Sequence, residues 1–343
     1  MIFNMVGGGG GSSTKSTIIV SIDTGSTVAA YSDSSYQTLV KTASEKSTGE
    51  YWLTGLANGT YYIKATKSGD ETTTSYTITE YGVYRIGMSY DTRPVFTYTG
   101  SYELVDDTDT DISAETVWQG DWKLRLLTSG TLTFSKVDNG IDVFLVGGGG
   151  GGIAGSMSYP GSGAGGYTTT ALGVSITKNS PYSIIIGEGG DNANGGVSSA
   201  FEQSAEGGTR GWSGNDFTSG GGGMGGSGGA SEGGTAGTDG GNGSGTGSGR
   251  NCYYNESTSG WVVGTSGTYT TYTTNKGQGT TTREFGEPSG TLYASGGANT
   301  KNKSSYINGA ANTGNGGEGG YNTGNKRGGK GGSGIVIIRN ARS

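Results

Sequence analysis

Residues 141–152 read Ile141-Asp-Val-Phe-Leu-Val-Gly-Gly-Gly-Gly-Gly-Gly152, so an apolar run passes directly into six consecutive glycines. A second apolar run, Ile335-Val-Ile-Ile338, follows Gly331-Gly-Ser-Gly334 near the other end of the chain. Continuous apolar runs of this length are typical of strands that are buried on both faces. We therefore expect the two runs to pair in one sheet, with a glycine-rich block between them.

The composition of this block excludes a conventional core. The chain has 343 residues, of which 75 are glycine and only 30% are hydrophobic, and 59 of the glycines fall within residues 147–334. A chain this poor in large apolar side chains cannot organise its whole length around them. Its low content of charged residues, 15%, argues against the disordered class that self-repulsion keeps open. The block is therefore either a flexible linker or an ordered array of closely packed main chains.

Glycine recurs at every third position within the block. Gly222-Gly-Met224, Gly225-Gly-Ser227 and Gly228-Gly-Ala230 are consecutive Gly-Gly-x triplets, and similar triplets fill residues 316–321 and 328–333. Three residues per turn is the period of the polyproline-II helix, so glycine in this register leaves a side of each helix bare. We therefore predict a packed polyglycine-II-type array.

Such an array has to form as a whole. Ordering a residue costs about 1–2 kcal/mol of backbone entropy, and glycine loses the most. Polyglycine-II helices have no internal hydrogen bonds, so their neighbours must supply the partners. An internal repeat also favours order. An aromatic residue followed by a stretch with small residues and a glycine pair occurs at residues 201–208 and again at 285–297.

The N-terminal part shows a different pattern. Residues 49–65 carry apolar residues at every second position on both sides of Asn58-Gly59, a strong hairpin signal. Their Gly-x-Tyr51-x-Leu53 and Leu56-x-x-Gly-x-Tyr61-x-Ile-x-Ala pattern resembles the carboxypeptidase-regulatory-like (prealbumin-type) β-sandwich. The resemblance implies a small prealbumin/Ig-like sandwich over residues 15–90, with a spacing or stabilising role.

The remaining segments complete an all-β prediction. Residues 1–14 are expected to be an N-terminal segment with a glycine spacer, and residues 91–115 a solvated acidic linker. The acidic run at 106–111 resembles the start of a calcium loop, but Ile112 stands where the sharp turn needs glycine. Residues 116–343 are expected to form the glycine-rich domain on a β-strand base. Within it, residues 168–177 and 182–186 are predicted to form a hairpin across Asn179-Ser-Pro181.

The glycine-rich part carries a set of recognisable motifs. They are Trp122-Lys-x-Arg, Thr128-Ser-Gly-Thr-Leu-Thr-Phe134, Ile141-Asp-Val-Phe-Leu-Val-Gly147, Ala164-Gly-Gly-Tyr167, Phe201 and Phe285 with their glycine pairs, and Gly-Ser-Gly-Ile335-Val-Ile-Ile-Arg339. In this combination the chain resembles the glycine-rich domain of bacteriophage and prophage tail fibre proteins. The resemblance covers residues 116–340. It implies a virion tail component whose packed polyglycine helices form a rigid body and whose distal loops contact the host. The long, glycine-poor insert at residues 250–282 departs from that pattern.

The insert supplies the candidate binding residues. Flat aromatic faces together with neutral hydrogen-bonding groups suit carbohydrate recognition. The residues predicted to bind a host-surface glycan are Tyr253, Tyr254, Trp261, Tyr269 and Tyr272 in the insert, with Trp212 and Phe217 in a second loop-like stretch. The alternative is that these aromatic residues plug the ends of the glycine array.

Composition narrows the function classes further. The absence of histidine and the single cysteine, Cys252, remove the usual general base, nucleophile pairs and metal clusters. The net charge of −6 argues against the basic surface that nucleic-acid binding needs. The chain has no run of about 18 apolar residues, so we do not expect it to insert into a membrane. Residues 1–6 are too short and lack the basic residues of a signal peptide, so release by host lysis is expected.

We therefore expect a non-enzymatic tail fibre or adhesin without cofactor or metal, made in the host cytoplasm and located in the virion. Its expected partners are other phage tail subunits, a host glycan and further copies of itself, since fibre proteins commonly trimerise. One alternative is a glycan-cleaving tailspike enzyme, which needs two carboxylates about 5–9 Å apart. Glu206, Asp216 and Glu256 are candidates for that pair. Another alternative is a purely structural virion or bacterial surface protein.

Overall fold

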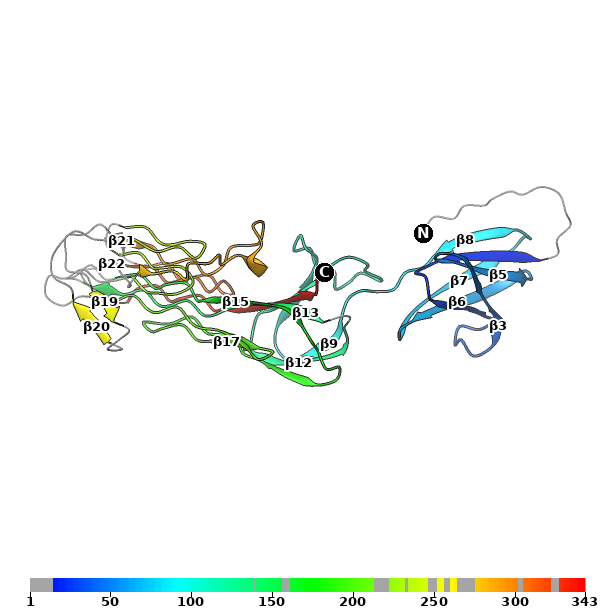
Figure 1. The fold of residues 1–343 in the computed structure, drawn as a ribbon, viewed down its shortest axis with the longest axis horizontal. Helices are drawn as coiled ribbons and strands as arrows, with labels where there is room; N and C mark the ends of the chain where they lie inside the picture. The colour runs from blue at the N-terminus through cyan, green and yellow to red at the C-terminus, as the bar shows by residue number, and fades with distance from the viewer. Residues whose placement is uncertain are drawn as a thin grey trace. The chain divides into compact units, whose positions relative to one another are not determined.

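The computed structural model describes residues 15–137, 140–155, 161–212, 222–231, 234–245, 252–255, 260–263, 275–301, 305–321 and 327–342. They form an all-β protein whose chain divides into two compact units (Figure 1). One unit comprises the chain up to Arg93 together with Ala114–Gly120. The other comprises Pro94–Ser113 and the chain from Asp121 onward. Within the described ranges, no helix is long and apolar enough to cross a membrane.

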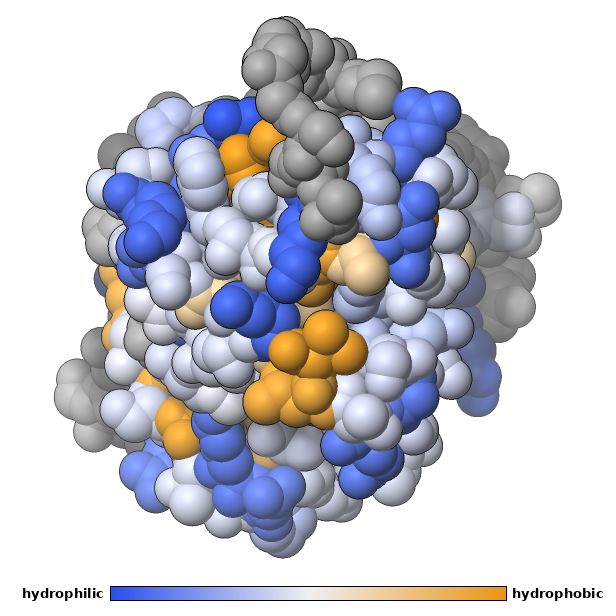
Figure 2. Space-filling view, turned by 90° about the vertical axis from the view of Figure 1, so that its right-hand side faces the viewer, coloured by the Kyte–Doolittle hydropathy of each residue, from blue (hydrophilic) through white to orange (hydrophobic). Residues whose placement is uncertain are grey.

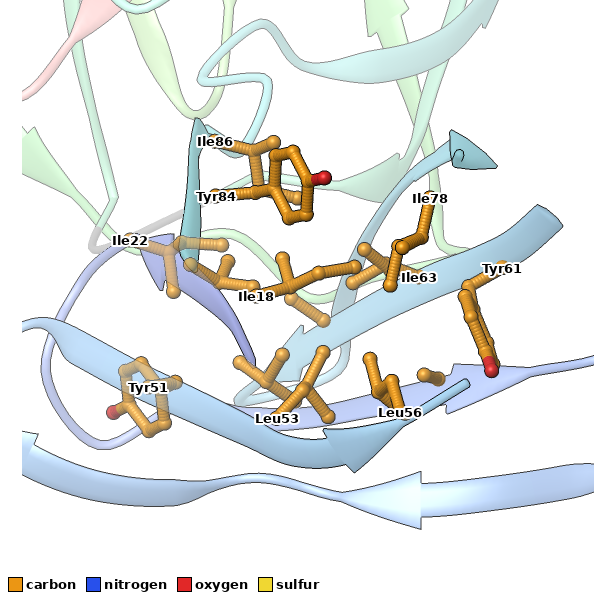
Figure 3. Packing of buried hydrophobic residues seen from close by; sticks show 14 of the residues in the cluster. Ile18, Ile22, Tyr51, Leu53, Leu56, Tyr61, Ile63, Ile78, Tyr84 and Ile86 are labelled. Atoms are coloured by element: carbon orange, nitrogen blue, oxygen red, sulfur yellow. The ribbon is translucent and has the colours of Figure 1, made fainter. Parts of the chain in front are cut away.

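The N-terminal unit is a sandwich of two four-stranded sheets. The first has the order β4 (Ser44–Ser47), β5 (Glu50–Leu56), β1 (Ser16–Ser21), β8 (Val83–Gly87), and the second β3 (Leu39–Thr42), β2 (Thr27–Tyr31), β6 (Gly59–Lys67), β7 (Asp70–Ile78). Alternate residues of both sheets point into one apolar core (Figure 3). Leu53 of β5 and Ile63 of β6 are both fully buried in it. The period-two pattern therefore marks the inner face of each sheet.

The predicted hairpin at Asn58-Gly59 is wrong. β5 pairs with β1 and β4, whereas β6 pairs with β2 and β7, so the turn carries the chain from one sheet to the facing one. The alternating pattern reveals which face of a strand is buried, but it does not reveal which sheet the strand joins. The real hairpin of this region joins β6 to β7 through Ser68-Gly69.

The second unit begins with a β base of two sheets. Its larger sheet has the order β10 (Tyr102–Val105), β11 (Lys123–Leu126), β23 (Ile335–Asn340), β13 (Ile141–Val146), β15 (Thr168–Val174), and the smaller β16 (Pro181–Ile184), β12 (Gly130–Lys136), β9 (Val95–Tyr98). β13 and β23 are antiparallel neighbours, with Val146 opposite Ile335. The predicted pairing of the two apolar runs is confirmed, and both strands are buried.

Two other expectations for this unit are corrected. β15 and β16 do not form the hairpin predicted for residues 168–186, because β15 adds to β13 and β16 adds to β12. Residues 95–105, within the predicted linker, form β9 and β10, each at an edge of one base sheet. The acidic run that follows, 106–111, dominated the sequence pattern and concealed these short strands.

The glycine-rich block is an ordered lattice of main chains, and the segment 147–152 lies at its centre. Its N–H groups donate in rotation to three neighbours: Gly147 and Gly150 to segment 164–167, Gly148 and Gly151 to 193–196, and Gly149 and Gly152 to 329–332, at 2.8–3.0 Å. Three further segments donate back to its carbonyl groups, from Gly190, from Gly208 and Gly211, and from Gly317. Six neighbours with a rotation of three residues define polyglycine-II packing.

A second segment, 161–166, is surrounded in the same way. Its N–H groups donate to residues 209–212, to 227–230 and to 314–317, again changing neighbour at each residue and returning after three. Both central segments are completely buried, yet they contain almost no side-chain atoms. Hydrogen-bonded main chain therefore forms the interior that the composition lacks in apolar side chains.

The triplet pattern follows from the same packing. A Cβ atom on Gly222 or Gly223 would lie 2.0 Å from a main-chain oxygen of a neighbouring segment, and the same holds for Gly225 and Gly226 at 1.9 and 2.0 Å. Only the third position of these triplets has room, and Met224 occupies it in the first triplet. The third position of a Gly-Gly-x triplet therefore admits a side chain, which is half-buried at Met224 and fully buried at Ser227 and Ala230. The all-glycine run 147–152 is buried at every position.

The two copies of the internal repeat, at residues 201–208 and 285–297, both begin with a turn that returns the chain to the lattice. Phe201 lies between β17 (Ser198–Ala200) and β18 (Gln203–Ala205), and Phe285 lies in the 3-10 turn η2 (Glu284–Gly286). Both residues have left-handed backbone, with φ of 50° and 53°, and both rings are buried. The following glycine pairs enter the lattice, since Gly208 and Gly297 donate to Gly148 and Gly163.

Candidate functional site

The lattice runs from the β base to an end that carries small separate sheets (Figure 1). There β14 (Ala154–Gly155), β22 (Gly319–Tyr321) and β21 (Asn299–Lys301) form a parallel sheet, and β19 (Cys252–Asn255) and β20 (Gly260–Val263) form a hairpin. We call this end the lattice tip. The glycine-poor insert contributes the hairpin, so Cys252–Asn255 and Gly260–Val263 lie at the tip. Residues 275–282 of the insert lie along the lattice instead, where Gln278 bonds Thr168 of β15.

The predicted binding residues have different positions. Tyr253 and Tyr254 lie in β19, Trp261 lies in β20, and Tyr254 is the register partner of Trp261. Trp212 lies in a lattice segment, where it is half-buried and its carbonyl accepts the N–H of Gly161. Phe217, Tyr269 and Tyr272 lie outside the described residues.

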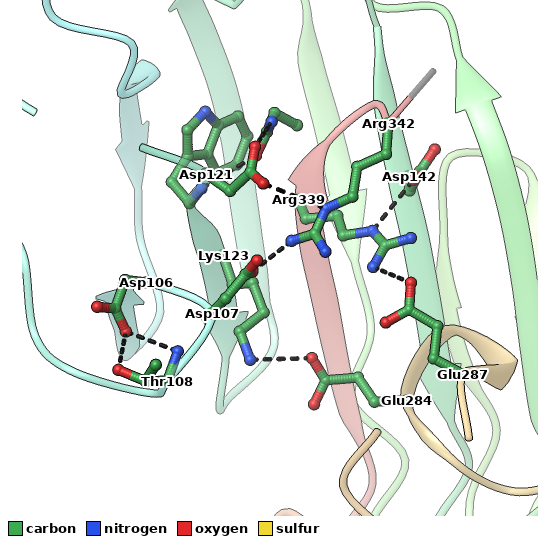
Figure 4. Close-up of polar contacts among 12 residues, drawn as sticks. Asp106, Asp107, Thr108, Asp121, Lys123, Asp142, Glu284, Glu287, Arg339 and Arg342 are labelled. Atoms are coloured by element: carbon green, nitrogen blue, oxygen red, sulfur yellow. Dashed lines mark hydrogen bonds and ion pairs between the residues drawn. The ribbon is translucent and has the colours of Figure 1, made fainter. Parts of the chain in front are cut away.

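A buried charge cluster in the β base was missed by the sequence analysis (Figure 4). Arg339 of β23 bonds Asp142 of β13 at 3.1 Å and Glu287 at 2.6 Å, and its guanidinium lies 3.9 Å from the ring centre of Phe285. Lys123 of β11 contacts Glu284 at 3.2 Å. We call Lys123, Asp142, Glu284, Glu287 and Arg339 the basal charge cluster.

The ion pairs of the basal charge cluster indicate that it stabilises the contact between η2 and the base strands. Burial raises the pKa of Glu284, and the charge of Lys123 counteracts that rise only in part. Each carboxylate of the cluster has a cation within 3.2 Å, so the group joins η2 to the base strands. A cavity of about 190 Å³ beside it is lined by Lys123, Glu284, Glu287 and Arg339 of the cluster together with Asp107, Asp109, Arg342 and residues 289–291. Arg339 ends the closing apolar run, and that position was the only signal in the sequence.

A second cavity, of about 380 Å³, opens on the flank of the lattice. Its lining combines an aromatic ring, a thioether, the ammonium-bearing side chain of one lysine and neutral hydrogen-bonding groups. The residues are Tyr167, Thr168, Met224, Lys276, Gly277, Gln278 and Thr280. The Gln278 amide accepts from the N–H of Thr168 and donates to the Thr168 hydroxyl, so it holds β15 against the end of the insert.

The sequence model of the glycine-rich domain family matches residues 127–341, more than half of the chain. The chain belongs to this family. The match begins just before β12 and ends after β23, so the glycine-rich domain includes the paired strands β13 and β23 and the lattice between them.

Other comparisons are less informative. No curated protein matches the chain. A crystal structure of the major pilin subunit BcpA of Bacillus cereus is similar at 13% identity and a TM-score of 0.22, over 48% of this chain. The chain spans about half of the pilin's length, 51%, and a similarity this low supports no conclusion about function.

Proposed function

We propose that this protein is a non-enzymatic bacteriophage tail protein, a fibre or adhesin, which attaches to a glycan of the host surface through its lattice tip. In this proposal it is a virion component that contacts other tail subunits and further copies of itself, and lysis of the host releases it. Membership of the glycine-rich domain family and the resemblance to tail fibre proteins support the assignment.

The observation that carries the proposal is the six-neighbour packing around residues 147–152. A body made of hydrogen-bonded main chain holds its end loops at a fixed distance from the base without large side chains. Preorganised loops lose less conformational entropy on contact with a ligand, which favours tight binding. The lattice therefore suits the presentation of a recognition surface.

The chemistry of the tip indicates the ligand class. The β19–β20 hairpin carries Tyr253, Tyr254 and Trp261 within a segment rich in threonine and serine. Aromatic side chains with few rotatable bonds offer large contact areas at little entropic cost, and hydroxyl groups match those of sugars. The alternative, a glycan-cleaving enzyme, has no support from the basal charge cluster, because its described carboxylates are ion-paired.

Adsorption of virions to host cells tests the proposal. Virions whose tail protein carries Tyr254→Ala and Trp261→Ala should adsorb at least about tenfold more weakly, since central interface aromatics are common hot spots. Tyr81→Ala removes an exposed tyrosine of the N-terminal unit, 49% accessible, and serves as the matched control. Unchanged adsorption of the double variant, or sugar release from host envelopes by the wild-type protein, would contradict the proposal.

A further inference from the structure

Three tyrosines form a connected group on the outer surface of the N-terminal unit. Tyr31 of β2 and Tyr62 of β6 are register partners, and the ring of Tyr36 lies edge-on to both, with centroid distances of 5.6 and 6.4 Å. All three side chains are half-buried. Tyr62 alternates with the core residues Tyr61 and Ile63, so the group faces away from the sandwich core. We call it the tyrosine face.

The middle ring of the tyrosine face is held by a strained loop. Tyr36 has a φ of 56°, a left-handed conformation that is uncommon for any residue other than glycine. Asp33 fixes this loop, because its carboxylate accepts hydrogen bonds from Ser35, from the Gln37 N–H at 3.2 Å and from the Thr38 N–H at 2.7 Å. Strain that the surrounding structure maintains is concentrated at functional sites, so the fixed position of Tyr36 suggests a role in recognition.

Hydroxyl groups surround the rings. Thr60 and Thr77 bond each other at 3.0 Å on the same outer surface, and Ser75 stands opposite Tyr62 in the register. The hydroxyls of the core tyrosines Tyr51 and Tyr61 donate to main-chain oxygens. By contrast, the hydroxyls of the tyrosine face form no hydrogen bond with any residue in the described ranges. They are therefore available to a ligand.

The ammonium beside the rings is paired with a carboxylate. Lys64 lies 5.7 Å from the ring centre of Tyr36 and is ion-paired with Glu71. A hydrogen bond from the Lys64 ammonium to Glu71 raises the pKa of Lys64, so this ammonium remains protonated. A space-filling view of one end of the molecule shows apolar residues only in small patches among hydrophilic side chains (Figure 2). An uncharged, hydroxyl-rich partner matches the tyrosine face best.

We propose that the tyrosine face binds a neutral oligosaccharide. The rings of Tyr31, Tyr36 and Tyr62 contact sugar C–H faces, while Ser75, Thr77 and the phenol hydroxyls exchange hydrogen bonds with sugar hydroxyls. This site is separate from the lattice tip and does not depend on the proposed tip function. It makes the N-terminal unit a second binding module as well as a spacer.

A microarray of neutral glycans, probed with the labelled full-length protein, provides the test. The wild type should bind one glycan class, and Tyr36→Ala should weaken that binding at least about tenfold. Tyr81→Ala, at an exposed tyrosine of the same unit, should bind like the wild type. A signal that Tyr36→Ala lowers and Tyr81→Ala does not is assigned to the tyrosine face and not to the lattice tip. Far-ultraviolet circular dichroism establishes that each variant is folded. Tyr36→Phe, which keeps the ring, should retain most of the affinity.

Three results would overturn the proposal. They are a wild-type protein that binds no neutral glycan on the array, a folded Tyr36→Ala variant that binds as well as the wild type, and Tyr36-dependent binding of a decaproline peptide in place of glycans. The last result matters because aromatic surfaces also recognise proline-rich segments.

Discussion

Gly150 shows at the scale of one residue why the lattice needs glycine. A Cβ atom there would lie 2.1 Å from the Thr209 oxygen and 2.4 Å from its carbonyl carbon, and main-chain atoms cannot rotate away. We expect Gly150→Ala to destabilise the glycine-rich domain by about 3 kcal/mol or more, the upper range for overpacking. Urea unfolding measures the effect. Gly87→Ala is the control, because a Cβ atom there meets nothing within 4 Å, and equal stability losses in the two variants would show that steric overlap is not the cause.

Asp33 gives a prediction about pH at the same scale. Hydrogen bonds from the Ser35 hydroxyl and from the Gln37 and Thr38 amides hold the pKa of Asp33 well below its ordinary value of 3.8. A carboxyl with a lowered pKa in the folded state stabilises the loop above pH 3.8, and this stabilisation is lost as the pH falls through the folded pKa. Amide exchange at Gln37 and Thr38, corrected for intrinsic rates, should therefore accelerate in strong acid.

Asp33→Ala should produce the same acceleration at neutral pH. Asp191→Ala, at an exposed bend in the other unit, is the control. Protection of Gln37 and Thr38 that is independent of both pH and Asp33 would show that other contacts hold Tyr36 in place.

At the scale of strands, the sequence predicts burial better than pairing. The runs that became β13 and β23 could be identified because a continuous apolar stretch between glycines favours a strand covered on both faces. The two predicted hairpins failed because an alternating strand fits either sheet of a sandwich equally well. The basal charge cluster could not be predicted at all, since Asp142 and Arg339 are separated by 197 positions along the chain.

The pair Asp142–Arg339 joins β13 to β23, and both side chains are nearly inaccessible, at 2% and 5%. Arg339→Leu leaves the Asp142 charge buried without its cation, which costs about 3–5 kcal/mol in comparable cases. We therefore expect thermal unfolding at a clearly lower temperature. The double variant Arg339→Leu with Asp142→Leu removes both charges and should be at least as stable as Arg339→Leu alone. A double variant less stable than either single variant would contradict this view.

At the scale of the whole molecule, period-three glycine predicted the lattice, but neither the number nor the order of its neighbours. Those depend on where each segment turns, which the spacing of the glycines does not specify. The aromatic residues of the insert were predicted as one group. The structure pairs Tyr254 with Trp261 in the β19–β20 register, and Trp212, which was predicted in a second stretch, lies in a lattice segment.

The lattice should exchange its amide hydrogens as one cooperative body. Every N–H of residues 147–152 is bonded to a different segment from the one before it, so no segment can open without breaking bonds to three neighbours. We expect these amides to be protected as strongly as those of β13 and β23, with the exposed bend at Asp191 as the fast reference. Gly150→Ala should release all lattice segments together, while the amides of the N-terminal sandwich keep their rates. Random-coil exchange across residues 147–152 beside a protected β base would mean that the glycine-rich block is a tether, and the lattice tip would then lose the rigidity on which the adhesin proposal depends.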